Sequence, residues 1–263
     1  MSRASSQVET YPDAHAAALA CGRRILTWLE QAIAERGAAT LAISGGSSPR
    51  PMFEMFAGAD FPWNSVNLFW VDERCVPWDD PQSNYRLARE TWLAPARFPE
   101  GNIHAVQTYA QPEEAARGYD AGIRAALGLK PGELPQFDVI HRGMGADGHT
   151  ASLFPGSPYI TERDAIAAAV YFERLGQWRV TLTGGVLEAA RHTAILATGA
   201  DKAATLDAVL HGPYDPMRYP AQIASREGSS AVWFVDQAAA GAGAEAPGPE
   251  GTPRLKPAPP GAD

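Results

Sequence analysis

A histidine and a carboxylate lie two residues apart in the glycine-rich stretch 143–149. Its three glycines permit sharp turns and a close approach of the backbone to a ligand. His149 is suited to moving a proton near neutral pH, and Asp147 could orient the imidazole or stabilise its charged form. The stretch follows a strand pattern at 137–140, and open α/β sheets place active sites where strands end. We predict a catalytic loop carrying His149 and Asp147; the alternative is an ordinary Asp-Gly turn beside a helix cap.

A second candidate site is a turn of small residues that follows the strand pattern at 39–43. The turn consists of Ser44, Gly45, Gly46 and Ser47. Backbone N–H groups in such a turn, with the N-terminus of a helix expected near Pro49, suit a phosphate group. The alternative is an ordinary strand-to-helix turn with a serine cap. The turn is neither a Walker loop nor a G-x-G-x-x-G fingerprint, so the sequence does not indicate ATP or NAD.

Charged side chains follow two further strand patterns. Asp72 and Arg74 come after the pattern at 66–71. There they could bind hydroxyls, polarise a carbonyl or hold a phosphate, and a solvated charged turn is the alternative. Lys202 comes after the pattern at 193–198, at the start of an expected helix. A lysine there opposes the helix dipole, so a bound anion would explain it, while a solvent-exposed lysine is the alternative.

Strand and helix patterns alternate along the chain. Strand patterns occur at 39–43, 66–71, 137–140, 178–182, 193–198 and 231–235, and helix patterns at 13–36, 83–93, 113–127 and 201–210. The alternation predicts a Rossmann-like α/β fold, with a mostly parallel sheet covered by helices on both faces. Trp70 and Trp233 are expected in the core. From Ala238 onward Ala, Gly, Pro and Glu dominate, so we expect a catalytic domain over 1–240 and a disordered tail over 241–263.

The composition of the 263 residues limits the classes of function. A net charge of -8 argues against a nucleic-acid partner. No apolar run reaches the length of a membrane helix, and the first residues lack the apolar stretch of a signal peptide. Two cysteines indicate a reducing compartment, so we expect a cytoplasmic protein. The other histidines stand singly, without the spacing of metal ligands, so no metal site is predicted.

In order and spacing these motifs resemble the 6-phosphogluconolactonase family, from about Tyr11 to Ala239. The resemblance rests on Ser-Gly-Gly-Ser, on Asp-Glu-Arg with Ser-Asn-Tyr at 83–85, and on the whole of 143–156. It implies hydrolysis of 6-phospho-D-glucono-1,5-lactone to 6-phospho-D-gluconate in the oxidative pentose phosphate pathway, without a metal or organic cofactor. It also implies the fold of the sugar-phosphate isomerases and glucosamine-6-phosphate deaminases. The expected partner is this small sugar-phosphate lactone, and the protein is expected to be a monomer or a small homo-oligomer.

The same resemblance implies roles for individual residues. The substrate phosphate would bind at the Ser-Gly-Gly-Ser turn, with Arg74 and Lys202 as cationic partners. His149 corresponds to the general base with Asp147 as its neighbour, and Arg179 to a basic position facing the site. A δ-lactone is an activated ester, so His149 would take a proton from the attacking water. Nearby N–H groups or Arg74 would then stabilise the oxyanion.

Two other functions share this kind of site. An amino-sugar-phosphate deaminase or isomerase typically has Asp-Glu-Tyr, Asn-Gly-His and Phe-Asn-Glu-Pro. Here the corresponding segments are Asp-Glu-Arg, Asp-Gly-His and, at 152–155, Ser-Leu-Phe-Pro, which lacks the carboxylate that ring opening requires. A non-catalytic sugar-phosphate sensor usually carries a helix-turn-helix segment, and about ten residues before the first helix leave no room for one. The lactonase function is therefore favoured.

Two departures from the family pattern remain. His141 and Arg142 replace the apolar pair usual at the end of that strand. Arg142 would add an anion contact if it points into the cleft, and would lie on the surface if it points outward. Gly184 and Gly185 stand where the family tends to have an apolar or proline-containing turn, which leaves the shape of that loop open.

Overall fold

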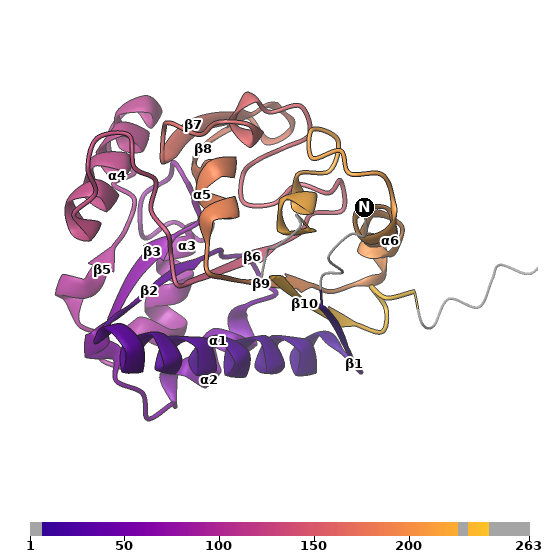
Figure 1. Cartoon of the computed structure of the whole chain (residues 1–263), viewed down its shortest axis with the longest axis horizontal. Helices are drawn as coiled ribbons and strands as arrows, with labels where there is room; N and C mark the ends of the chain where they lie inside the picture. Colours follow the sequence, from indigo (N-terminus) through magenta and orange to yellow (C-terminus); the bar gives the residue numbers. More distant parts are fainter. Residues whose placement is uncertain (1–6, 226–230, 242–263) are drawn as a thin grey trace, which may run out of the picture.

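A seven-stranded parallel sheet forms the centre of the computed structural model, which describes residues 7–225 and 231–241 (Figure 1). All neighbouring strands run parallel. Across the sheet the order is β1 (Gln7–Tyr11), β10 (Ala231–Asp236), β9 (His192–Ala197), β6 (Val139–Gly143), β2 (Ala39–Ile43), β3 (Val66–Trp70) and β5 (Ile103–His104). The predicted α/β fold with a mostly parallel sheet is confirmed.

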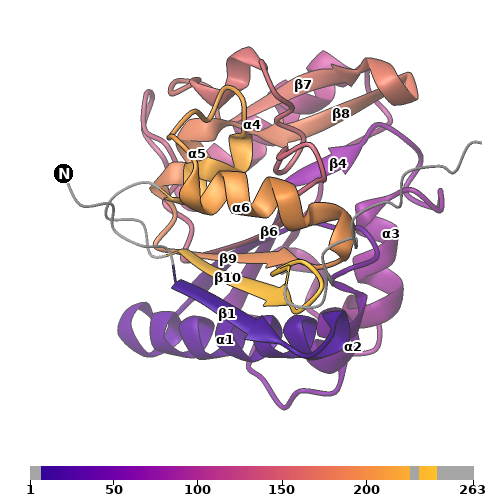
Figure 2. The ribbon, with the colours of Figure 1, turned by 90° about the vertical axis from the view of Figure 1, so that its right-hand side faces the viewer.

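Helices cover both faces of this sheet. Figure 2 shows α1 (Ala14–Arg36) and α2 (Arg50–Ala57) below it, and α5 (Gly184–Ala189) and α6 (Ala203–His211) above it. The other helices are α3 (Asn84–Ala88) and α4 (Pro112–Leu127). The pattern at 83–93 is thus confirmed as helical, although α3 continues as a π-helical turn over Arg89–Leu93. The pattern at 201–210 becomes α6 only from Ala203, after a 3-10 turn over Ala200–Lys202.

A second, three-stranded antiparallel sheet lies above the first (Figure 2). Its order is β4 (Asp72–Arg74), β8 (Gln177–Leu182) and β7 (Ala167–Phe172). The strand predicted at 178–182 exists, but it pairs outside the parallel sheet. Val71 joins the two sheets, because its N–H donates to Ile43 O (2.8 Å) and its carbonyl accepts from Leu182 N–H (2.8 Å). The residues after β3 are therefore drawn into a new strand instead of a turn.

Residues at the two ends of α1 explain where this helix begins and ends. The Asp13 carboxylate accepts a hydrogen bond from Ala16 N–H (2.8 Å), the usual role of an N-cap residue. Gly37 ends α1 in the left-handed region, with φ of 80°. The predicted core positions Trp70 and Trp233 are buried.

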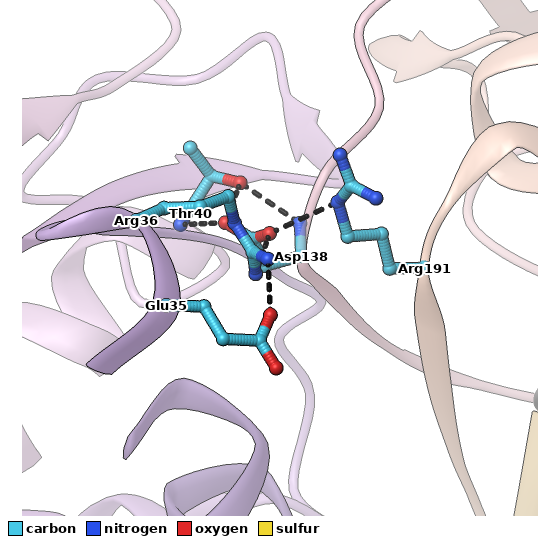
Figure 3. Close-up of polar contacts among 5 residues, drawn as sticks. All are labelled: Glu35, Arg36, Thr40, Asp138 and Arg191. Carbon is cyan, nitrogen blue, oxygen red and sulfur yellow. Dashed lines mark hydrogen bonds and ion pairs between the residues drawn. The ribbon is translucent and has the colours of Figure 1, made fainter. Parts of the chain in front are cut away.

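The buried carboxylate of Asp138 links the chain segments at the N-terminal ends of three central strands (Figure 3). This carboxylate accepts hydrogen bonds from Arg36 Nη2 (2.8 Å) and Thr40 N–H (2.9 Å), and Arg191 Nε lies 3.3 Å from it. The guanidinium of Arg36 also reaches Glu35. These contacts join the end of α1 to the starts of β2, β6 and β9. The candidate site residues lie at the opposite ends of these strands.

Two further predictions concerned a C-terminal tail and membrane-spanning helices. Except for Gly241, the tail predicted at 241–263 lies outside the described residues. Within 7–225 and 231–241, no helix is both long and apolar enough to cross a membrane. Four strands were not predicted from the sequence patterns, namely β1, β4, β5 and β7.

Candidate functional site

A cavity of about 220 Å³ opens where the central parallel strands end. Of the residues predicted for a site, it is lined by Ser44, Gly45, Gly46, Ser47, Asp72, Arg74, His149, Arg179 and Lys202. Asp147 is the one predicted site residue that does not line the cavity. It contacts the Nδ1 atom of His149 instead. The fold therefore gathers residues that are up to 158 positions apart along the chain, from Ser44 to Lys202, around one space.

His149 and Asp147 form a direct pair in the loop after β6. The Nδ1 atom of His149 lies 2.5 Å from Asp147 Oδ1, which also accepts the backbone N–H of His149 (3.1 Å). The hydrogen bond to the imidazole lowers the pKa of Asp147 to about 2, so this carboxylate is charged at neutral pH. A charged acceptor at Nδ1 holds the proton there and leaves Nε2 as the nitrogen that can take a proton.

Two glycines of the loop lie where a larger residue would clash with a neighbouring ring. A Cβ atom on Gly145 would lie 2.1 Å from both Cε1 and Nδ1 of His149. Gly148 has φ of 82°, and a Cβ there would lie 2.8 Å from the Tyr219 ring. The loop closes on itself, since Gly145 N–H donates to His149 O (2.9 Å). Glycine is therefore required at 145 by the close approach of the His149 ring, and at 148 by the left-handed backbone and the nearby Tyr219 ring.

The turn after β2 has the features of an anion site. The hydroxyl of Ser44 is buried and has no hydrogen-bond partner among the described residues. A Cβ on Gly45 would lie 2.1 Å from Asn84 Oδ1, and this amide oxygen is also unpartnered. Gly46 has φ of 97°. Buried polar atoms without partners are expensive, so their presence around a cavity at the start of α2 indicates a polar ligand.

Three cations reach the same cavity. Arg74 and Arg179 are opposite each other in the register of β4 and β8, and the Nε atoms of both are buried without a partner. Burial lowers the pKa of Arg179; the charge of Asp72 opposes this effect, and the charge of Arg74 adds to it. The third cation, Lys202, donates from Nζ to Thr198 O (2.7 Å). Like charges that face each other are unfavourable in the absence of a ligand, so this wall of the cavity is suited to an anion.

The segment 72–74 is not the solvated charged turn that was the alternative. Asp72 and Glu73 are 6% and 1% exposed. Asp72 Oδ2 accepts a hydrogen bond from Ser152 Oγ (2.9 Å). Glu73 accepts from the backbone N–H groups of Asn84 (2.8 Å) and Tyr85 (2.7 Å), so it anchors the start of α3. Burial raises the pKa of Glu73.

Asn84 and His141 also line the cavity and were not predicted as site residues. Asn84 belongs to the Ser-Asn-Tyr segment at 83–85, which contributed to the family resemblance but had no predicted binding role. Ser83 of the same segment caps α3, because its Oγ accepts from Arg86 N–H (3.1 Å). His141 is fully buried, and neither ring nitrogen has a partner in the described part of the chain. The departure from the apolar pattern was the available signal for it.

Both interpretations of Arg142 are wrong. The residue follows His141 in β6, so its side chain takes the other face of the sheet. It is fully buried, does not line the cavity, and has the charge of Glu188 and the hydroxyl of Tyr214 near it.

The structure also gives the shape of the segment at Gly184 and Gly185, because these residues begin α5. A Cβ on Gly184 would lie 1.9 Å from Ile160 O, which explains the glycine.

The fold and this geometry define an α/β protein in which a histidine–aspartate pair lies at a cavity lined by three cationic side chains. The family model described as "Glucosamine-6-phosphate isomerases/6-phosphogluconolactonase" matches residues 12–233, and the chain belongs to this family. It is 40% identical over 223 residues to a 6-phosphogluconolactonase of Synechocystis, covering 84% of this chain and 90% of that protein. It is 31% identical over 245 residues to one of Mycobacterium tuberculosis, covering 90% and 98%.

Solved structures agree with this assignment. The 6-phosphogluconolactonase of Thermotoga maritima superimposes with a TM-score of 0.76 at 30% identity, covering 88% of this chain and 99% of the other. A monomeric glucosamine-6-phosphate deaminase shares the fold, with a TM-score of 0.75 at 16% identity and coverage of 90% and 99%. The expected family, with its sugar-phosphate isomerase fold, is therefore confirmed.

Proposed function

We propose that the protein hydrolyses 6-phospho-D-glucono-1,5-lactone to 6-phospho-D-gluconate in the oxidative pentose phosphate pathway. The observation that carries the proposal is that His149, paired with Asp147, lines the same cavity as three cationic side chains. A base alone would fit many hydrolases, but a base beside an anion-binding wall fits a phosphorylated lactone. The names of the relatives from Synechocystis and Mycobacterium tuberculosis support the same substrate.

The substrate phosphate binds at the Ser44–Ser47 turn. Backbone N–H groups and the N-terminus of α2 face it, and the unpartnered Ser44 hydroxyl donates to it. Arg74 and Lys202 supply the positive charge. Anchoring the phosphate fixes the lactone ring against His149, and such positioning supplies a large part of the rate enhancement.

His149 acts as the general base. Its Nε2 takes a proton from water, and the oxygen of that water attacks the lactone carbonyl carbon. Asp147 stabilises the imidazolium that forms. The tetrahedral intermediate then collapses, the bond from the carbonyl carbon to the ring oxygen breaks, and the imidazolium returns its proton to that oxygen. Arg74 or nearby N–H groups stabilise the oxyanion, a role worth several kcal/mol in other enzymes.

The deaminase or isomerase function is less well supported by the same loop. Leu153 is buried in the core, and Phe154 packs on the imidazole of His149 with ring centroids 4.8 Å apart. These side chains occupy the place where the rival function has a carboxylate. An effector-binding role without catalysis does not explain why a charged carboxylate orients His149.

The test is lactone hydrolysis by the purified protein with freshly generated substrate, corrected for spontaneous hydrolysis. Glucosamine-6-phosphate deamination is measured in parallel. Rapid lactone turnover that is lost in His149→Ala supports the proposal. Ammonia release without lactone turnover would replace it by the deaminase function, and no activity with either substrate would favour a sensor.

We also infer a single catalytic domain over 1–240, a cytoplasmic location, and a monomer or small homo-oligomer without nucleic-acid partners. The acidic net charge of -8 supports the last point. Both cysteines are unbridged, as expected in a reducing compartment. Size-exclusion chromatography with light scattering measures the assembly state.

A further inference from the structure

An aromatic stack connects the second sheet to the catalytic loop. Phe172, the last residue of β7, stacks on Phe154 with ring centroids 4.0 Å apart and planes 2° from parallel. The other neighbour of Phe154 is His149, whose ring centroid lies 4.8 Å away. Phe172 does not line the cavity, and so it belongs to the support behind the site.

Arg179 lies beside this stack. Its Cζ atom is 5.4 Å from the ring centroid of Phe172 and 5.9 Å from that of Phe154. The polar contact of the guanidinium within the described residues is a long hydrogen bond to Gln177 Oε1 (3.3 Å), and its Nε is buried without a partner. Besides this hydrogen bond and the attraction to Asp72, the two phenyl rings are the contacts that can place this cation.

Aromatic rings can hold a guanidinium without neutralising it. A carboxylate partner would fix Arg179 but would also cancel the charge that attracts an anion. The ring quadrupole attracts the cation and leaves its N–H groups available. A residue that binds a phosphorylated or oxyanionic ligand needs this combination of a fixed position and unused donors.

We propose that Phe172 is a positioning residue for substrate binding, which acts by holding Arg179 through the Phe172–Phe154 stack. The proposal rests on the proposed function in one respect, namely that Arg179 contacts the lactone substrate. We expect Phe154 to stay in place in variants of Phe172, because the adjacent Leu153 is anchored in the core, so the proton-transfer pair should keep its neighbour. The effect of losing the Phe172 ring therefore falls on KM.

The kinetic test compares Phe172→Leu with Phe172→Tyr, and Tyr171→Leu is the matched control. Tyr171 is the adjacent residue, but it packs on Trp178 (5.2 Å) and is half-exposed. Phe172→Leu should raise KM for the phosphorylated lactone about 5- to 30-fold, with kcat within about twofold. Phe172→Tyr and Tyr171→Leu should stay near wild type. Equal effects of Phe172→Leu and Tyr171→Leu would overturn the proposal.

A double-mutant cycle shows whether the effect passes through Arg179. In an Arg179→Met background, Phe172→Leu should change KM by less than about twofold, because the cation it holds is gone. The same fold-change in both backgrounds would mean that Phe172 supports the hairpin in general, and the proposal would fail.

The mobility of Arg179 gives a readout that needs no substrate. Nitrogen-15 relaxation of Arg179 Nε in the ligand-free protein should show an ordered side chain in wild type and Phe172→Tyr, and a mobile one in Phe172→Leu. An unchanged order parameter in Phe172→Leu overturns the proposal. Loosening of Arg179 in a protein that does not hydrolyse the lactone would instead refute the proposed function and leave the positioning role standing.

Discussion

Arg74 on β4 and Arg179 on β8 are register partners on antiparallel strands, so two guanidinium groups meet at one wall of the cavity. Opposed like charges cost up to about 1 kcal/mol, and here both side chains also have buried, unpartnered Nε atoms. The buried carboxylate of Asp72 partly balances the two charges, since it acts on the pKa of Arg179 in the direction opposite to Arg74. The unpartnered Nε atoms leave donors for an anion between the two groups, so we expect the pair to serve ligand binding more than stability.

Arg179→Met should consequently separate stability from binding. Without ligand, the variant should stay close to wild type in stability, because the repulsion from Arg74 and the attraction to Asp72 are lost together. Its KM for the phosphorylated lactone should rise at least about tenfold, as for the loss of a charged hydrogen-bond donor. Urea unfolding and initial-rate kinetics measure the two quantities. A large loss of stability in the ligand-free variant would show that Arg179 is structural.

The proton-transfer pair should affect kcat. His149→Ala is expected to reduce kcat about 10²- to 10⁴-fold with little change in KM, because it removes a group that acts in the transition state. Asp147→Asn keeps the shape but removes the charge that faces Nδ1, so its kcat should fall less than that of His149→Ala. Steady-state kinetics measures both variants. A rise in KM alone in His149→Ala would assign the imidazole to binding.

Lys202 should discriminate between lactones with and without a phosphate. Its Nζ lines the cavity near the Ser44–Ser47 turn and donates to Thr198 O, which holds the ammonium group in place. Lys202→Ala should raise KM for the phosphorylated lactone and have a much smaller effect on glucono-1,5-lactone. Equal effects on the two substrates would contradict the phosphate assignment.

His141 should make the stability of the protein depend on pH. Burial lowers its pKa to about 4, whereas the unfolded chain has the ordinary value near 6.5. Between these values the unfolded state binds the proton and the folded state does not, so stability is lost as pH falls from about 6.5 to about 4. The total loss from this residue is about 3 kcal/mol.

The contribution of His141 is isolated by difference. Burial also lowers the pKa values of His104 and His192, which act in the same direction. Burial raises the pKa of Glu73, which acts in the opposite direction. Urea unfolding at several pH values compares wild type with His141→Leu, whose stability should fall less steeply below pH 6.5. Parallel pH profiles would mean that His141 is protonated in the folded state.

Local patterns were sufficient for the parts of the fold that depend on local physics. The long apolar repeat, the cap at Asp13 and the terminating Gly37 define α1 within its own sequence. Strand pairing is different, because 178–182 has the same pattern in either sheet and its partner is set by the chain around Val71. β7 begins with three alanines, which are weak strand formers, and so it gave no signal.

The residues of the candidate site were also predictable from the sequence only where local spacing indicates them. Glycines at 145 and 148 indicate close approach from sequence alone, and the structure supplies the neighbours, which are the imidazole of His149 at Gly145 and the ring of Tyr219 at Gly148. Contacts between distant segments gave no such signal. Asn84 reaches Gly45 across the cavity, and Phe172 reaches Phe154 from another sheet. Such contacts depend on tertiary packing, which no local spacing encodes.

Arg142 provides a test of how this protein tolerates a buried charge. Its side chain is fully buried, and its three guanidinium nitrogens have no hydrogen-bond partner within residues 7–225 and 231–241. Burial lowers its pKa to about 10, so it remains charged at neutral pH, with Glu188 as the nearest source of compensation. A buried charge without hydrogen-bond partners is costly, and removal of Arg142 leaves Glu188 its ion pair with Arg163 (2.8 Å).

Arg142→Leu should therefore raise the free energy of unfolding by about 1–3 kcal/mol. Since Arg142 faces away from the cavity, kcat and KM should stay within about twofold of wild type. Urea unfolding at neutral pH and lactone kinetics measure these effects. Arg142→Lys is the matched control, because it keeps the charge and should not stabilise. A destabilised Arg142→Leu would mean that the guanidinium makes a favourable ion pair in solution.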